Sequence, residues 1–187
     1  MGHGLMKALP NILTASRILV IPPLVVAFYL PFPEGNWIAF VLYVLAAVTD
    51  FFDGYLARSM HTTSKLGQFL DPIADKLIVV STILMLVAFG RIEGLHIVAA
   101  LIILCREILV SGLREFLATL TIQVPVTQLA KWKTALQLVA LGGLILGEAA
   151  PVWLPAELVG LSCLWIAAAL TAYTGYGYIR AGMKHIW

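Results

Sequence analysis

Six long apolar runs dominate this chain of 187 residues and limit the folds that it can adopt. Short segments rich in Pro, Gly or charge separate the runs, which extend over residues 12–31, 37–58, 68–89, 95–118, 129–149 and 154–179. Each run is close to the roughly 20 residues that a helix needs to cross the hydrocarbon core of a bilayer. Inside that core a helix satisfies its own backbone hydrogen bonds. The sequence therefore predicts an all-α bundle of six transmembrane helices.

The composition agrees with a membrane protein built as one domain. Hydrophobic residues make up 61% of the chain and charged residues only 12%, with a mean hydropathy of +0.96, which exceeds the usual range of soluble domains. Six spans leave no room for a second domain, so we expect a single membrane domain over residues 1–187. Residues 1–10 are expected to lie along the membrane surface. The net charge of +2 is small and dispersed, which argues against a nucleic-acid partner.

The distribution of cations predicts the orientation in the membrane. One predicted side carries nine of them: Lys7, Arg58, Lys65, Lys76, Arg114, Lys131, Lys133, Arg180 and Lys184. On the other side, Arg91 is the one cation in the three predicted loops. Lys and Arg are enriched in cytoplasmic loops. Both termini are therefore predicted to be cytoplasmic, together with the loop between the second and third spans.

Four aspartates lie where the second predicted span ends and the third begins. Asp50 and Asp53 are three residues apart, and Asp71 and Asp75 are four apart, so each pair shares one face of its helix. A carboxylate at membrane depth is costly unless a cation pairs with it. Carboxylates without nearby His or Cys suit one or two hard divalent cations, Mg²⁺ or Mn²⁺ before Zn²⁺. We expect two ions, a device that recurs in phosphoryl transfer.

Two local roles are also open to single members of this set. Asp71 followed by Pro72 fits a helix N-cap with Pro at the first helical position, and Asp53 and Arg58 fit a local ion pair. Each of these roles explains one residue, whereas a metal site explains all four aspartates.

Small residues lie beside the aspartates. Gly54 and Ala57 share the helical face of the second-span carboxylates, and Gly67 lies one turn before those of the third span. Residues with almost no side chain let a ligand or another backbone approach closely. The sequence therefore predicts a cleft beside the metal site.

The spacing D-x-x-D-G-x-x-A-R-x8-G-x3-D-x3-D resembles the signature of the CDP-alcohol phosphotransferase family. Eight residues within a stretch of 26 match it: Asp50, Asp53, Gly54, Ala57, Arg58, Gly67, Asp71 and Asp75. The resemblance implies a six-helix membrane enzyme, often dimeric, that moves a phosphatidyl or similar group from a CDP-linked donor to an alcohol and releases CMP. It also implies that the four aspartates are metal ligands and that Asp75 is the general base. The donor would bind to Asp53, Gly54, Ala57, Arg58 and Gly67.

Three further stretches, residues 11–17, 106–115 and 131–134, resemble bacterial members of this family that use sn-glycerol 3-phosphate as acceptor. Arg106 and Arg114 are eight residues apart and share a helical face inside the fourth span, where an unpaired guanidinium is costly. With Lys131 and Lys133 they form a candidate pocket for the phosphate of the acceptor, because cationic groups of this kind bind phosphate well.

Simpler explanations of these cations remain open. Each arginine is followed by a possible local partner, Glu107 or Glu115, although pairing there does not exclude substrate binding. The two lysines can be explained by the positive-inside rule alone. A polar wall of the same cavity is expected from three residues at the first span: Asn11, Thr14 and Arg17. For Tyr178, near the end of the chain, we expect helix packing or interfacial anchoring.

Together with these features, the resemblance implies an enzyme that transfers the phosphatidyl group of CDP-diacylglycerol to sn-glycerol 3-phosphate. Its expected location is the cytoplasmic membrane of a bacterium, as a homodimer in the lipid bilayer. A family member with another acceptor, such as a phosphatidylinositol-phosphate or cardiolipin synthase, is the main alternative, and the stretch 106–115 argues against it. A cation-coupled transporter would be expected to have carboxylates near mid-membrane and inverted repeats. A purely structural membrane subunit would not need four carboxylates.

Overall fold

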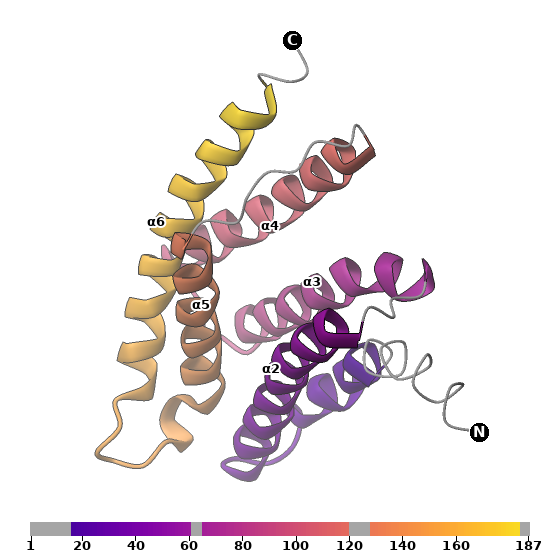
Figure 1. Ribbon diagram of the computed structural model, residues 1–187. Helices are drawn as coiled ribbons and strands as arrows, with labels where there is room; N and C mark the ends of the chain where they lie inside the picture. Colours follow the sequence, from indigo (N-terminus) through magenta and orange to yellow (C-terminus); the bar gives the residue numbers. More distant parts are fainter. Residues whose placement is uncertain (1–15, 61–64, 120–127, 184–187) are drawn as a thin grey trace, which may run out of the picture. The chain divides into compact units, whose positions relative to one another are not determined.

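The structure, a computed structural model, describes residues 16–60, 65–119 and 128–183, and every regular element in these ranges is a helix (Figure 1). The first helix covers Ser16–Ala27. The elements that follow it are α2 (Glu34–Met60), α3 (Lys65–Ala88), α4 (His96–Thr119), α5 (Gln128–Leu146), the 3-10 turn η1 (Gly147–Ala149) and α6 (Ala156–Met183). The predicted all-α fold is confirmed for the described residues. The expected surface segment, residues 1–10, lies outside them.

The order of the helices follows the six predicted runs, and their described ends differ from the predicted ones by up to four residues. Two of these differences have a clear cause. α5 ends at Leu146 instead of residue 149, because Gly147 has a φ of 49°, a left-handed conformation that stops a helix. α6 continues to Met183, beyond the predicted end at residue 179, and carries Arg180 in its last turn, where a cation favours the helix C-terminus.

The chain forms two compact units, residues 1–89 and 90–187. In the first unit, the ring of Phe89 packs near the rings of Phe28 and Tyr29, with centroid distances of 5.6 Å and 5.1 Å. A Cβ atom on Gly35 would lie 2.7 Å from two carbonyl oxygens, one at the end of the first helix and one in the turn after it. Only glycine therefore lets α2 begin so close to that segment.

In the second unit, α6 packs against both α4 and α5 (Figure 1). α5 and α6 approach each other closely at Gly143 and Gly160. A Cβ on Gly143 would lie 2.8 Å from the carbonyl oxygen of Ala156, and one on Gly160 would lie 2.9 Å from Cγ of Leu144. Small residues at such crossings bring helix backbones together, and this packing contributes to the association of membrane helices.

The substitution Gly143→Ala is expected to destabilise this unit by about 1–3 kcal/mol, the usual cost of overpacking. The added methyl meets a backbone carbonyl of α6, so the two helices must separate. Thermal unfolding in detergent measures the effect. Gly112→Ala on α4 is the matched control, because no atom lies within 4 Å of its Cβ position and Ala favours a helix over Gly. Equal unfolding temperatures for the two variants would contradict this account of the crossing.

The segment between α3 and α4 also ties the second unit together. Arg91 lies between two glycines with positive φ, and its Nη1 donates to the carbonyl oxygens of Leu144 (3.2 Å) and Ile145. The last carbonyls of a helix have no partners within it, so Arg91 caps α5. Burial lowers the pKa of Arg91, and the nearby carboxylates Glu148 and Glu157 oppose this shift.

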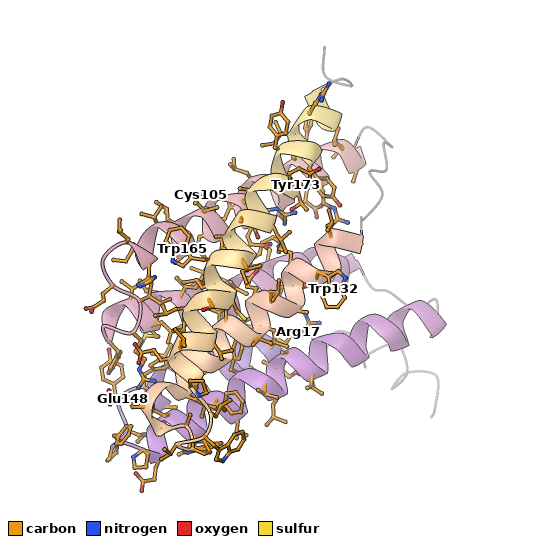
Figure 2. The ribbon with its side chains drawn as sticks, turned by 90° about the vertical axis from the view of Figure 1, so that its left-hand side faces the viewer. Arg17, Cys105, Trp132, Glu148, Trp165 and Tyr173 are labelled. Carbon is orange, nitrogen blue, oxygen red and sulfur yellow. The ribbon has the colours of Figure 1, made fainter. Side chains whose placement is uncertain are left out.

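Two of the described helices, α4 and α6, are long and apolar enough to cross a membrane. Only 22% and 39% of their most apolar stretches are buried within the protein, whereas the core helix of a soluble domain is mostly buried. Trp132 on α5 and Tyr173 on α6 are also exposed, at 67% and 70% of their surface (Figure 2). Apolar surface of this extent is typical of a face that contacts lipid or another protein.

Candidate active site

The backbone places all four motif aspartates in two consecutive helices. Asp50 lies ten residues before the end of α2, and Asp75 lies ten residues after the beginning of α3. With a rise of about 1.5 Å per residue, each lies about 15 Å from the helix ends that residues 61–64 connect. Asp53 and Asp71 lie about 10 Å from the same ends. The two pairs therefore lie at matching distances from the connection between α2 and α3.

Of these four side chains, the structure describes that of Asp75. It forms an ion pair with Arg17 of the first helix, 58 residues earlier in the sequence. The side chain of Arg17 is 4% exposed and that of Asp75 is 45% exposed. The sequence predicts Arg17 as part of a polar wall, and the structure gives it a partner within the aspartate motif. Asn11 and Thr14 lie outside the described residues.

The other motif residues are described by their backbone alone. Gly54, Ala57 and Arg58 lie in the last two turns of α2, and Gly67 lies in the first turn of α3. Among the described side chains, no three His, Cys, Asp or Glu residues form a cluster that could hold a metal ion, and these side chains include only one of the four aspartates. The donor set itself, four carboxylates on two consecutive helices, fits a hard divalent cation.

A second polar cluster lies in the unit formed by α4, α5 and α6. Lys133 on α5 is 4% exposed and forms an ion pair with Oε1 of Glu107 on α4. Nη1 of Arg106 lies 3.6 Å from the same oxygen. Local pairing of Arg106 with Glu107, which the sequence leaves open, is therefore present. The sequence pattern does not identify Lys133 as the second partner of this carboxylate.

α6 supplies further contacts of Arg106. Nη2 of Arg106 donates to Oγ1 of Thr174 at 3.4 Å, and its Cζ lies 5.8 Å from the ring centroid of Tyr178, within cation–π range. The sequence pattern predicts packing or anchoring for Tyr178 and does not single out Thr174. The available signal is a pair of threonines, Thr171 and Thr174, one turn apart in an apolar helix.

The structure describes the four predicted acceptor-binding cations to different extents. Arg106 and Lys133 both contact one carboxylate and are largely buried. Arg114 is exposed, about two helical turns beyond Arg106 on α4. The side chain of Lys131 lies outside the described residues, although its backbone is in the first turn of α5. The structure thus brings two of the four together.

Comparison with known protein families agrees with the aspartate motif. Residues 7–173 match the family described as CDP-alcohol phosphatidyltransferase. The chain belongs to the CDP-alcohol phosphatidyltransferase family. This match covers most of both compact units and all of the residues predicted from the sequence as ligands or catalytic groups.

Individual members of the CDP-alcohol phosphatidyltransferase family are similar over nearly their full length. A protein of Rickettsia bellii is 48% identical over 177 residues, which cover 95% of this chain and 96% of the relative. A protein of Cereibacter sphaeroides is 39% identical, with 96% and 97% covered, and one of Haemophilus influenzae is 38% identical, with 92% and 91% covered. All three are named CDP-diacylglycerol–glycerol-3-phosphate 3-phosphatidyltransferase.

Proposed function

We propose that this protein is a membrane phosphatidyltransferase that moves the phosphatidyl group of CDP-diacylglycerol to sn-glycerol 3-phosphate and releases CMP. The observation that carries the proposal is the similarity over nearly the full length to relatives named for this reaction, in a chain that keeps all eight residues of the motif. The products are phosphatidylglycerol phosphate and CMP, which places the enzyme in phospholipid biosynthesis.

The reaction is an in-line displacement at the β-phosphorus of the donor. The primary hydroxyl of the acceptor attacks this phosphorus, a new P–O bond forms, and the bond to the CMP oxygen breaks. Asp75 takes the proton of the attacking hydroxyl as general base. Arg17 holds the carboxylate of Asp75 through their ion pair and so fixes its direction. Gly54, Ala57, Arg58 and Gly67, with Asp53, hold the cytidine diphosphate part of the donor.

The four aspartates also fit a metal site. Asp50, Asp53, Asp71 and Asp75 would hold two divalent cations, Mg²⁺ or Mn²⁺, because hard cations of this kind prefer carboxylate oxygens. When bound, such ions neutralise the charge of the diphosphate.

The acceptor phosphate is the ligand that we assign to the cationic cluster. Arg106 and Lys133 are largely buried with one carboxylate between them, so these three side chains carry one net positive charge. A buried net charge is costly, and an anionic phosphate oxygen compensates it. Arg114 and Lys131 are the further cations that we assign to this ligand. Acceptors without a phosphate group, such as inositol or serine, would bring no phosphate oxygen to this cluster.

We also propose the arrangement in the membrane. One domain of six spans lies in the cytoplasmic membrane of a bacterium, with both termini and the aspartates on the cytoplasmic side, and two copies form a dimer. The exposed apolar surfaces of α4 and α6 and the asymmetry of the cations support this arrangement.

Release of CMP by the purified protein in detergent, with CDP-diacylglycerol and Mg²⁺, tests the proposed reaction. Among sn-glycerol 3-phosphate, inositol phosphate, serine and phosphatidylglycerol as acceptors, the first is expected to support turnover at least about 100-fold faster than the others. It alone combines a phosphate monoester, the group assigned to the cationic cluster, with a primary hydroxyl, the proposed nucleophile. Turnover with another acceptor and none with sn-glycerol 3-phosphate would overturn the proposal.

A further inference from the structure

α6 carries buried polar groups beside Arg106. Thr174 is 7% exposed, although the helix around it is apolar. Its hydroxyl donates to the carbonyl oxygen of Leu170 at 2.8 Å and accepts from Nη2 of Arg106 at 3.4 Å. Because the hydroxyl proton is already used within the helix, its oxygen faces the arginine as an acceptor. Thr174 therefore fixes one end of the guanidinium.

Gly175, the next residue, provides the space for the arginine side chain. A Cβ atom at Gly175 would lie 2.9 Å from Cγ of Arg106 and 3.7 Å from its Nε. Real Cβ atoms do not approach other carbon atoms so closely, so any larger residue would displace the aliphatic part of Arg106. One turn later, the ring of Tyr178 lies 5.8 Å from Cζ of the guanidinium. Three positions of α6 thus determine where Arg106 lies.

The other end of the guanidinium contacts the next residue of α4, because Nη1 of Arg106 lies 3.6 Å from Oε1 of Glu107. Nη1 and Nη2 therefore both have partners. Nε of Arg106 is buried and has no hydrogen-bond partner among the described residues. A buried donor of a charged group that lacks a partner is costly, so this atom is suited to an oxygen of a bound ligand.

We propose that α6 is a positioning element of the acceptor site, in which Thr174 and Gly175 hold Arg106 so that its Nε donates to the acceptor phosphate. The inference rests on the proposed function, which assigns that phosphate to Arg106. Thr174 and Gly175 act through Arg106 and do not themselves contact the acceptor.

Gly175→Ala tests the inference. The added methyl is expected to raise the KM for sn-glycerol 3-phosphate about tenfold and to leave the KM for CDP-diacylglycerol within about twofold, because only the acceptor cation moves. Gly177→Ala is the matched control: it lies two residues further along α6, and no atom lies within 4 Å of its Cβ position. Both KM values are expected to be unchanged in this control.

A second pair of variants covers the case in which Gly175→Ala does not fold. Thr174→Val keeps the shape of the side chain without its hydroxyl, and it is expected to raise the acceptor KM about threefold, as loss of one hydrogen bond does. Thr174→Ser keeps the hydroxyl and is expected to restore the value of the unmodified protein. Unchanged acceptor KM in the folded variants, or an equal rise in both KM values, would overturn the inference. Failure of the unmodified protein to release CMP with sn-glycerol 3-phosphate would instead overturn the proposed function, and with it this ligand.

Discussion

Asp75→Asn is expected to lower the rate of CMP release by about 10³-fold or more, within the range that general base catalysis contributes together with the loss of one ligand oxygen. The amide has nearly the same shape as the carboxylate but cannot accept the proton of the attacking hydroxyl. The carboxylate is 45% exposed, and the amide keeps an oxygen to which Arg17 can donate, so the protein should remain folded. Steady-state turnover with both substrates saturating measures the effect directly.

The same variant separates the two roles assigned to Asp75. Binding of Mn²⁺ followed by electron paramagnetic resonance reports on metal ligation without turnover. Retained Mn²⁺ binding with lost turnover would identify Asp75 as the base, whereas loss of both would assign it to the metal site first. Turnover close to that of the unmodified protein would remove Asp75 from the mechanism. Arg17→Gln is the companion variant, since it keeps Asp75 but removes the partner that orients it, and a smaller loss of turnover is expected.

Glu107→Ala is expected to destabilise the protein by about 3–5 kcal/mol, the usual cost of removing one partner of a buried ion pair. The reason is the burial of Lys133, whose side chain is 5% exposed and would lose the carboxylate that it contacts. Arg106 would lose the same partner, so two cations would remain in an apolar unit. The loss of stability is measured by heating the protein in detergent and recording the fraction that stays monodisperse at each temperature.

Two other glutamate variants sharpen this result. Glu107→Gln keeps an oxygen that Lys133 can donate to, so its loss of stability should be about half as large. Glu115→Ala lies eight residues later on the same helix, where the side chain is exposed, and is expected to change stability by less than about 0.5 kcal/mol. Equal stability of the variants Glu107→Ala and Glu115→Ala would show that the buried ion pair does not support the fold.

Most of the helix order follows from the sequence because apolar length is a local property. α4 shows this well, since the predicted span 95–118 and the helix His96–Thr119 differ by one residue at each end. α5 shows the opposite case. Its end depends on the left-handed conformation of Gly147 and on Arg91, which caps helix carbonyls 53 and 54 residues away. No local pattern contains that contact.

The candidate site also combines features that the sequence predicts with features that it does not. All four aspartates of the chain belong to the motif, and helical spacing alone groups them into two pairs. Periodicity states which residues share a face of a helix, but it does not state which other helix that face meets. The partners of Arg17 and Arg106 lie 58 and 68 residues away, at Asp75 and Thr174. These contacts depend on tertiary packing, which explains why the sequence offers the adjacent Glu107 as a partner of Arg106 but not these distant partners.

The cap on α5 has a practical consequence for mapping topology with proteases. Arg91 is the one basic residue predicted in the loops on the non-cytoplasmic side, so trypsin added from that side has a single predicted cleavage point there. Its guanidinium is bound to carbonyl oxygens of α5 and is partly buried, and proteases cut best at exposed, loosely held backbone. Intact protein after such digestion therefore shows that Arg91 is protected and does not show on which side of the membrane it lies. The side is shown by labelling a cysteine introduced beside Glu93, an exposed residue of the same segment.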